Sequence, residues 1–340
     1  MALLFFEGFD HYGNGSTIPT ASKWGLVDTH STLCNADSGS ARTGLCGARI
    51  SYAAEMITQP FTVSGGVILG FAMRNRDSWN LKEIFQIYES STLHLSLVVD
   101  ATGKLLVKRG DGTTLATGTT VLALNNWYYI ELKATIHDTT GSFTLKIDGT
   151  NELTASSQDT RNGGTGVWDR IRLQGAGSFN YDIDDIYICD TSGSAPWNDF
   201  LGNCKVDMLM PQTGNGTNAG LTPSTGTDHG ALVDENGPNT TDYNSSATVG
   251  TKDTYNYPSL ALTGIILGIQ TNLYAAKSDA GARTICAVVR AGGTDYDGAA
   301  VSPLTTYRYF TEVRQINPNT GVAWTSSDIT ALEAGMKIVS

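Results

Sequence analysis

Hydrophobic and polar residues alternate through much of the chain, and residues 125–149, NNWYYIELKATIHDTTGSFTLKIDG, show the pattern most clearly. Alternation with a period of two places successive side chains on opposite faces of an extended segment, so it predicts a β-strand with one buried face. The apolar face carries Tyr128, Ile130, Leu132, Ala134 and Ile136, and after HDTTG the alternation returns at Phe143, Leu145 and Ile147. Asp148-Gly149 suits the tight turn of a further hairpin. We therefore predict antiparallel strands here.

Strand signals separated by glycine-bearing turns recur on both sides of a break at DTSGSAPWND, residues 190–199. The chain has 340 residues, which is enough for two domains of roughly 150 residues each. Its 38 glycines favour many tight turns over long helices. We predict an all-β protein of two β-sandwich domains, residues 1–192 and 203–340, joined by a linker at 193–202.

The second domain begins with a predicted strand, CKVDMLMP, and continues into a long polar tract from Gln212 to Pro258. A loop of this length is unusual inside a compact domain, so we expect an arm that packs across the domain or across an adjacent subunit. Farther on, SDITALEAG predicts one short helix, capped by Ser326 or Ser327 and closed by Gly335, before a final strand MKIV.

The charge balance argues against two classes of partner. The chain has 22 basic and 33 acidic residues, a formal net charge of −11, so no basic surface for nucleic acid or anionic lipid is expected. The start, MALLFFEGFD, lacks the positive region of a signal peptide, and no apolar stretch approaches the roughly 18 residues of a membrane span. We expect neither nucleic acid nor membrane as a partner.

The five cysteines form no CxxC pair and lie near no histidine at metal-binding spacing, which argues against a zinc site. Cys34 and Cys46 flank one loop, and Cys189 and Cys204 flank the predicted linker. Either pair is a candidate disulfide in an oxidising setting, and inert buried thiols are the alternative.

Residues 179–190, FNYDIDDIYICD, place acidic residues in an otherwise apolar segment. Ile183 and Ile186 are an odd number of positions apart, so a regular strand would point them in opposite directions. A β-bulge at Asp184-Asp185 would restore the alternation, and burial on both faces is the other explanation. Asp182, Asp184 and Asp185 are also candidate ligands for calcium, whose six to eight oxygen ligands would include loop carbonyls.

The first domain resembles the concanavalin A-like (laminin G-like) jelly roll in the order of FFEGFD, NNWYYIELKATIHDTTGSFTLKIDG and FNYDIDDIYICD. Together, MALLFFEGFDHYG, DDIYICDTSGSAPWNDFLG and the tail VVRAGGTDYDGAA with NPNTGVAWTSSDITALEAGMKIV resemble a family of tailed-bacteriophage virion proteins. The resemblance implies a jelly roll at residues 1–192 and a virion component of the tail or capsid surface. It supplies no catalytic residues.

Two kinds of carbohydrate site were weighed. Trp79, in the polar loop RNRDSWNLK, is the best platform for a sugar ring, with Arg74, Arg76 and Asn80 as its polar neighbours. A retaining glycosidase needs two carboxylates roughly 5 Å apart, whereas the nearest pair, Glu83 and Glu89, would lie about 20 Å apart along an extended strand.

The sequence therefore leads us to expect a non-enzymatic structural component of a phage virion, assembled with other virion proteins and with copies of itself. Its jelly roll is expected to bind a host glycan in addition. No catalytic residue and no cofactor are assigned, with calcium as the exception left open. The alternatives from other classes are a host-glycan adhesin and a polysaccharide depolymerase of a tail spike.

Overall fold

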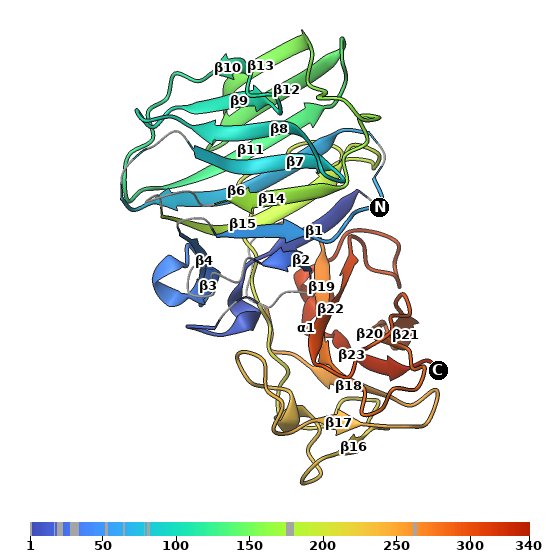
Figure 1. Cartoon of the computed structure of the whole chain (residues 1–340). Coiled ribbons are helices and arrows are strands. Elements are labelled where there is room, and N and C mark those ends of the chain that lie inside the picture. The colour runs from blue at the N-terminus through green and yellow to red at the C-terminus, as the bar shows by residue number, and fades with distance from the viewer. Residues whose placement is uncertain are drawn as a thin grey trace. The chain divides into compact units, whose positions relative to one another are not determined.

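The structure is a computed structural model that describes residues 2–16, 18, 23–27, 34–51, 54–63, 65–77, 79, 82–174, 180–260 and 264–340. Its regular secondary structure is almost wholly antiparallel β-strand, which confirms the predicted all-β class (Figure 1). The chain divides into unit 1, Met1–Thr20 and Trp24–Asp207, and unit 2, Ala21–Lys23 and Met208–Ser340. Residues 193–202, the predicted linker, fall within unit 1.

Unit 1 is a sandwich of two antiparallel sheets. Sheet A has the order β13-β12-β11-β6-β15-β4-β3, with β1 paired to β15, and sheet B has the order β10-β9-β8-β7-β14-β5-β2. The strands of sheet A are β1 (Leu3–Glu7), β3 (Cys34–Asp37), β4 (Gly47–Ile50), β6 (Val67–Asn75), β11 (Trp127–Thr135), β12 (Gly141–Ile147), β13 (Thr150–Gln158) and β15 (Tyr181–Asp190). Those of sheet B are β2 (Trp24–Val27), β5 (Glu55–Thr58), β7 (Lys82–Glu89), β8 (Thr92–Val99), β9 (Leu105–Arg109), β10 (Thr114–Thr117) and β14 (Arg170–Gln174).

The core of unit 1 lies between the two sheets. Phe71 of β6 and Phe85 of β7 stack there with ring centroids 4.3 Å apart, and both side chains are buried. The predicted hairpin is β11–β12, with Ile130 opposite Ile147 and Leu132 opposite Leu145. Their alternation with polar residues is what the sequence pattern indicated, because one face of each strand turns into this core.

The other face of β11 is less open than the alternation predicted. Glu131 is 1% exposed, and its Oε1 accepts hydrogen bonds from the Tyr187 hydroxyl at 2.5 Å and from the Gly202 N–H at 2.8 Å. Lys133 reaches the same segment, donating to the Asn198 carbonyl at 3.1 Å. Residues 198–202 thus cover the outer face of sheet A, and a polar residue in the alternation is buried beneath them.

Strand β15 contains the predicted bulge. Its register against β6 shifts between Asp184 and Tyr187, and Asp185 has a φ of 53°. All ten residues of the strand are buried, so the two explanations drawn from the sequence, a bulge and burial on both faces, both apply. Because of the bulge, Ile183 and Ile186 are buried on the same face of the sheet, which a regular strand would not allow.

Unit 2 contains a four-stranded sheet, β18-β23-β20-β21, and a two-stranded ribbon, β19–β22. Buried Ile285 and Ile338 of the sheet pack with Leu273 and Phe310 of the ribbon, which makes a smaller two-layer core. The strands are β16 (Thr222–Pro223), β17 (Asn244–Ser245), β18 (Lys252–Asn256), β19 (Ile269–Ala275), β20 (Ile285–Ala291), β21 (Thr294–Asp297), β22 (Arg308–Arg314) and β23 (Glu333–Ile338).

The polar tract from Gln212 to Pro258 folds against unit 2. It contains β16, β17, β18 and the 3-10 turn η3 (Gly230–Leu232). Within the tract, the buried Asp253 carboxylate of β18 accepts from the Leu221 N–H at 2.8 Å and pairs with His229 Nδ1 at 2.7 Å. Strand β18 also pairs with β23, which joins the tract to the sheet of this unit.

Three local expectations for the second half are wrong. The segment CKVDMLMP forms no strand. The short helix α1 (Ser326–Thr330) is capped by Thr325, in a capping box with Asp328, and not by Ser326 or Ser327. Gly335 does not close that helix, since it lies inside β23.

The cysteines in the described structure are unpaired thiols. Cys46, Cys189, Cys204 and Cys286 are all free, so neither candidate disulfide is formed. Burial raises the pKa of Cys46 to about 11, which keeps that thiol protonated. Cys46, Cys189 and Cys286 are buried, as the alternative of inert buried thiols predicts, and Cys204 is half-buried. Among the described residues, no helix is long and apolar enough to cross a membrane.

Candidate functional site

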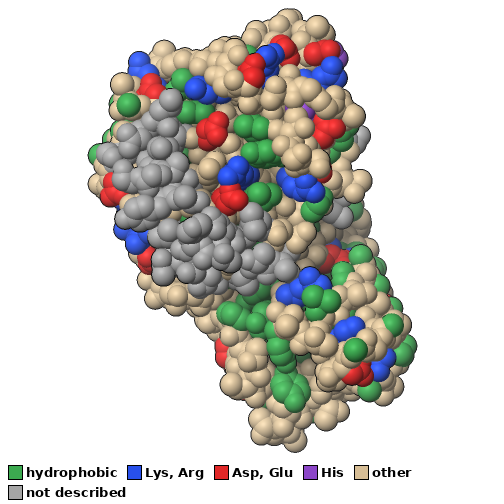
Figure 2. All heavy atoms as spheres, in the orientation of Figure 1, with side chains coloured by type: hydrophobic (Ala, Val, Ile, Leu, Met, Phe, Trp, Pro, Cys, Tyr) green, Lys and Arg blue, Asp and Glu red, His purple; other side chains and the backbone are tan. Residues whose placement is uncertain are grey.

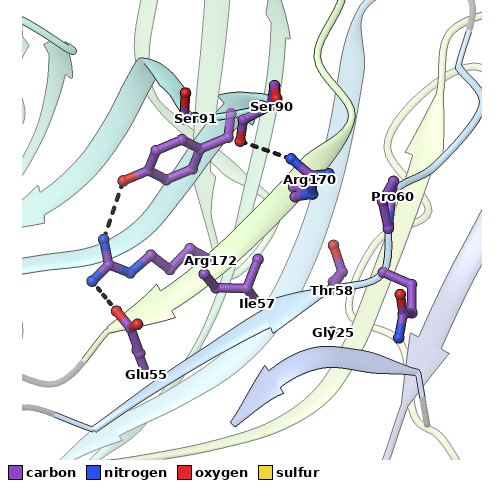
Figure 3. Close-up of a pocket in the computed structure, with 11 residues that line it drawn as sticks. Gly25, Glu55, Ile57, Thr58, Pro60, Ser90, Ser91, Arg170 and Arg172 are labelled. Atoms are coloured by element: carbon purple, nitrogen blue, oxygen red, sulfur yellow. Dashed lines mark hydrogen bonds and ion pairs between the residues drawn. The ribbon is translucent and has the colours of Figure 1, made fainter. Parts of the chain in front are cut away.

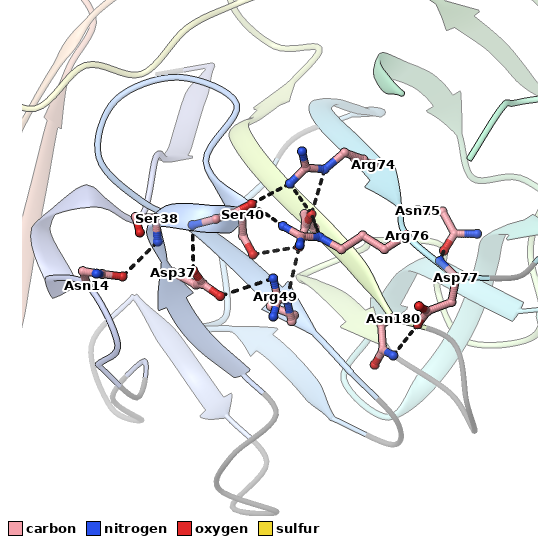
Figure 4. A network of polar contacts seen from close by, with 12 residues as sticks. Asn14, Asp37, Ser38, Ser40, Arg49, Arg74, Asn75, Arg76, Asp77 and Asn180 are labelled. Carbon is pink, nitrogen blue, oxygen red and sulfur yellow. Dashed lines mark hydrogen bonds and ion pairs between the residues drawn. The ribbon is translucent and has the colours of Figure 1, made fainter. Parts of the chain in front are cut away.

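Asp182, one of the predicted calcium ligands, lies in a cluster of arginines on sheet A. Figure 4 shows the arginines of this cluster, Arg49, Arg74 and Arg76. It is opposite Arg49 of β4 on one side and opposite Arg74 of β6 on the other. Its carboxylate accepts from Arg74 Nη2 at 2.6 Å, from Arg76 Nε at 2.5 Å and from Ser40 Oγ at 2.7 Å. The Asp182 carboxylate is fully buried, and a lone buried charge would cost much free energy. The guanidinium groups offset this cost by neutralising the carboxylate.

Asp184 and Asp185 at the bulge bind other parts of unit 1. Asp184 Oδ2 accepts from the backbone N–H groups of Arg42 and Thr43, at 2.8 and 3.2 Å. Asp185 accepts from Arg42 Nη1 at 2.8 Å and from the Val206 N–H at 2.8 Å. Burial raises the pKa of both carboxyl groups, that of Asp184 to about 8. The bulge therefore fastens two loops, residues 42–43 and residue 206, to the sheet.

These three carboxylates do not converge on one point as metal ligands would. In the described parts of the chain, no group of three or more His, Cys, Asp or Glu side chains is placed to hold a metal ion. Asp182 and Asp185 point to guanidinium groups, whose positive charge occupies the positions that a cation would need. The arrangement gives the same residues a structural use, and calcium binding by them stays a prediction.

The residues of the predicted sugar platform contact different neighbours. Arg74 and Arg76 both bind Asp182, and the Arg74 guanidinium lies 4.8 Å from the centroid of the Trp127 ring. Trp79 is half-buried, and its indole edge lies against Gly103 in another loop. Asn80 lies outside the described residues. Arg74 and Arg76 thus belong to the cluster around Asp182, and glycan binding at Trp79 stays a prediction.

Glu83 and Glu89, the pair weighed for glycosidase chemistry, have separate partners. Glu89 binds Thr165 and His94, and its hydrogen bonds, that of the Thr165 hydroxyl above all, lower its pKa to about 2. Glu83 binds Gln86 and, at 3.2 Å, the Ser96 hydroxyl. Glu89 is therefore ionised at neutral pH, and each of the two carboxylates is bound by partners of its own.

A surface hollow of about 560 Å³ lies on the outer face of sheet B, across β5, β14 and β7 (Figure 3). The alternation in RIRLQ explains why arginines line it. Ile171 and Leu173 are buried in the core, and Arg170 and Arg172 therefore point outward from the same strand. The other lining residues with polar groups or aromatic rings include Glu55, Thr58, Tyr88, Ser90 and Ser91.

One polar row crosses this face of the sheet. Arg172 donates from Nη1 to the Tyr88 hydroxyl at 3.1 Å and from Nη2 to the Glu55 carboxylate. The Tyr88 hydroxyl donates in turn to Gln86 Oε1 at 3.2 Å. Burial raises the pKa of Tyr88, and the nearby Glu83 adds to the rise. The phenol is therefore protonated at neutral pH and is held in place on both sides.

Arg170 is the other guanidinium group of the hollow. Its guanidinium donates to the Ser90 carbonyl at 2.8 Å and lies 3.7 Å from the Asp169 carboxylate. Its side chain is 28% exposed. Because a guanidinium has five N–H donors, most of them remain available to a ligand in the hollow.

The sequence interpretation missed this site, although it contained a signal for it. Two arginines separated by one apolar residue in RIRLQ indicate a strand with a charged outer face. The partners of Arg172, however, come from β5 and β7, which are far away in the sequence. Only the pairing of β14 between these two strands brings Glu55 and Tyr88 to either end of one guanidinium.

Comparisons with known proteins show a likeness in fold. No protein-family model and no curated protein matches the chain. Among solved structures, an endo-β-1,4-glucuronan lyase from the fungus Trichoderma reesei is 14% identical with a TM-score of 0.42, over 55% of this chain and 95% of that one. The alginate lyase Aly36B, solved as a mutant with an alginate tetrasaccharide, is 9% identical with a TM-score of 0.39, over 56% and 98%. Trypanosoma rangeli sialidase is 16% identical with a TM-score of 0.38, over 55% of this chain and 30% of its own.

These neighbours correct the expected function. They are polysaccharide lyases and a sialidase, and no virion protein is among them. The expectation of a non-enzymatic structural component of a virion is contradicted and is not carried forward. The likeness extends to the β-sandwich alone, so any activity must be argued from the side chains of this chain.

Proposed function

We propose that unit 1 binds an acidic polysaccharide in the hollow of sheet B. The observation that carries the proposal is the pair of arginines in that hollow. Its eleven lining residues include Arg170, Arg172 and one carboxylate, in a chain whose formal net charge is −11, and Asp169 also lies 3.7 Å from Arg170. Guanidinium donors that point outward favour a ligand with carboxylate or sulfate groups.

The charges elsewhere on unit 1 are mixed in sign. Over the face of unit 1 that Figure 2 shows, Lys and Arg side chains lie beside Asp and Glu side chains, without a large area of one sign. In the hollow, Arg172 is paired with Glu55, so its charge is largely compensated. Arg170 keeps donors free for an anionic group, and the arginine fork matches a carboxylate in geometry.

The remaining lining suits a sugar chain. Tyr88 offers a ring and a hydroxyl, and Ser90, Ser91 and Thr58 offer further polar groups. Sugar rings combine apolar C–H faces with hydroxyls at the rim, so they need both kinds of contact. We therefore assign one uronate or sulfated sugar residue to the neighbourhood of Arg170, with the chain passing over Tyr88.

Cleavage of the bound polysaccharide is the second candidate function, and the place of Tyr88 favours it. Tyr88 lines the hollow, and its hydroxyl lies within hydrogen-bond distance of Arg172. As a general acid, the phenol would give its proton to the glycosidic oxygen as the bond from that oxygen to the anomeric carbon breaks. Water would add to that carbon, and the proton that this water loses would return to the phenolate. Depolymerisation was one of the alternatives that the sequence left open.

The test is affinity electrophoresis of the full chain in gels that contain polyglucuronate, alginate, hyaluronan, a sulfated galactan or neutral dextran. We expect retardation by at least one acidic polymer, and we expect added salt to weaken it because the attraction is electrostatic. Incubation of each retarding polymer with the protein, followed by size analysis, tests cleavage. Equal mobility in all acidic gels and in a polymer-free gel would reject the proposal.

A further inference from the structure

The β19–β22 ribbon of unit 2 has one face that packs into the core and one that does not. Tyr274 is directly opposite Tyr309, and Leu273 is directly opposite Phe310. Because neighbouring residues of a strand point to opposite faces, these two pairs lie on different faces of the ribbon. Leu273 and Phe310 pack with the buried core, so Tyr274 and Tyr309 belong to the other face, which we call the tyrosine face.

The tyrosine face carries a row of rings. Tyr274 stacks on Tyr307 with ring centroids 5.3 Å apart and planes 25° apart, and its centroid lies 4.8 Å from that of Tyr309. Tyr274 and Tyr307 are half-buried, whereas Tyr309 is 6% exposed and supports the row. Burial raises the pKa of Tyr307, and the nearby Tyr243, which is 44% exposed, adds to the rise.

The rest of the tyrosine face carries no formal charge. Its other described members are Gln270, Asn272, Thr311 and Val313, and Gln270 Nε2 donates to Asn272 Oδ1 at 2.7 Å. In the described structure, the hydroxyls of Tyr274 and Tyr307 make no hydrogen bond to protein. The face therefore offers stacked rings, free hydroxyls and amide groups in one place.

We propose that the tyrosine face is a second carbohydrate site, which binds a neutral glycan. A neutral sugar chain matches it in two respects: its C–H faces stack on rings, and its hydroxyls pair with tyrosine hydroxyls and amides. An acidic polymer would find no cation on this face. A protein partner is the weaker match, because an apolar protein surface would bury the two tyrosine hydroxyls without giving them hydrogen-bond partners.

This inference is independent of the hollow of sheet B. The two sites lie in different units and differ in chemistry, since one depends on arginine and the other on uncharged rings. Loss of one is expected to leave the other unchanged, so each proposal can fail alone.

The test uses the full chain in affinity gels with neutral polysaccharides: dextran, yeast mannan, galactomannan and a soluble β-glucan. We expect at least one of them to retard the wild-type chain, and we expect the double variant Tyr274→Ala, Tyr307→Ala to bind it roughly tenfold more weakly or not at all. Tyr274→Phe, which keeps the ring, is expected to keep most of the affinity. Val322→Ala, at an exposed position of the same unit, and Arg170→Gln in the hollow are expected to bind as the wild type does.

Three results would overturn the proposal. The first is the absence of retardation by every neutral polymer, and the second is equal retardation of the wild-type chain and the double variant. The third is a wild-type dimer in light scattering that the double variant converts to a monomer, which would assign the face to contact between copies. Unfolding by heat controls for damage to the fold, and if the double variant has lost stability, the single variant Tyr307→Ala, outside β22, replaces it.

Discussion

Arg172 and Tyr88 are joined across neighbouring strands, with Arg172 Nη1 donating to the Tyr88 hydroxyl at 3.1 Å. They are not directly opposite each other, because Tyr88 pairs with Arg170 and Arg172 pairs with Gln86. The guanidinium therefore reaches diagonally over the sheet, and its other end meets Glu55 on β5. One side chain thus organises the floor of the hollow over three strands.

Replacement of Tyr88 by Phe tests that organisation. The variant keeps the ring and removes a hydroxyl that accepts from Arg172 and donates to Gln86. We expect the free energy of unfolding to fall by about 1 kcal/mol and acidic-polymer binding to weaken roughly fivefold. Chemical unfolding and binding titrations measure the two effects. If the second candidate function holds, cleavage is lost altogether, whereas cleavage at the wild-type rate would remove Tyr88 from that chemistry.

Asp182→Asn tests the structural use of the arginine cluster on sheet A. The substitution removes the charge that holds Arg49, Arg74 and Arg76 together at a fully buried position. We expect a loss of about 3 kcal/mol in the free energy of unfolding, because the guanidinium groups lose their shared counter-charge.

The matched control for this change is Asp37→Asn, which removes the other carboxylate paired with Arg49, at a partly exposed position. A loss below about 1 kcal/mol is expected there. Equal losses in the two variants, measured by urea unfolding, would show that Asp182 has no special weight.

Calcium is expected to leave the stability unchanged. The carboxylates of Asp182 and Asp185 already bind guanidinium groups, so a cation would have to displace them. Thermal unfolding with added calcium and with a chelator should give the same midpoint. A midpoint that rises with calcium concentration would restore the metal site, since a ligand that binds the folded state stabilises it by mass action.

The pH dependence of stability has a predicted sign. Burial raises the pKa of Asp10 from 3.8 to about 6, although the N–H groups of Leu45 and Cys46 oppose the rise. The folded state therefore binds more protons than the unfolded state between these values. The free energy of unfolding should fall as the pH rises from about 4 to about 7, by up to about 3 kcal/mol from this residue. Asp184 acts in the same direction up to about pH 8.

The variant Asp10→Asn isolates that effect. Its amide oxygen can still accept both backbone N–H groups, but the side chain no longer titrates in this range. We expect a flatter dependence of unfolding free energy on pH than in the wild-type chain. Parallel curves for the two proteins would show that Asp10 is not the group responsible.

The sequence predicted those parts of the fold that depend on local alternation. The β11–β12 strands and the bulge at Asp184-Asp185 follow from the positions of the apolar residues, because each side chain of a strand lies on one of the two faces of its sheet. The burial of Glu131 could not be predicted in this way, since the cover comes from residue 202 and the hydroxyl of Tyr187. The site was missed for a similar reason. Arg170 and Arg172 were visible as a pattern, but the strands beside them, which supply Glu55 and Tyr88, are fixed by long-range pairing.

The affinity of Arg170→Gln for the acidic polymer that retards the wild-type chain tests the central claim most directly. Arg161→Gln is its control, because Arg161 is also a partly exposed arginine of unit 1, paired with Asp138, and does not line the hollow. Titration calorimetry should show a dissociation constant at least roughly tenfold higher for Arg170→Gln, because one charge-assisted contact is lost. The dissociation constant of Arg161→Gln should equal that of the wild-type chain. Equal affinities of the wild-type chain and both variants would contradict the assignment of polysaccharide binding to this hollow.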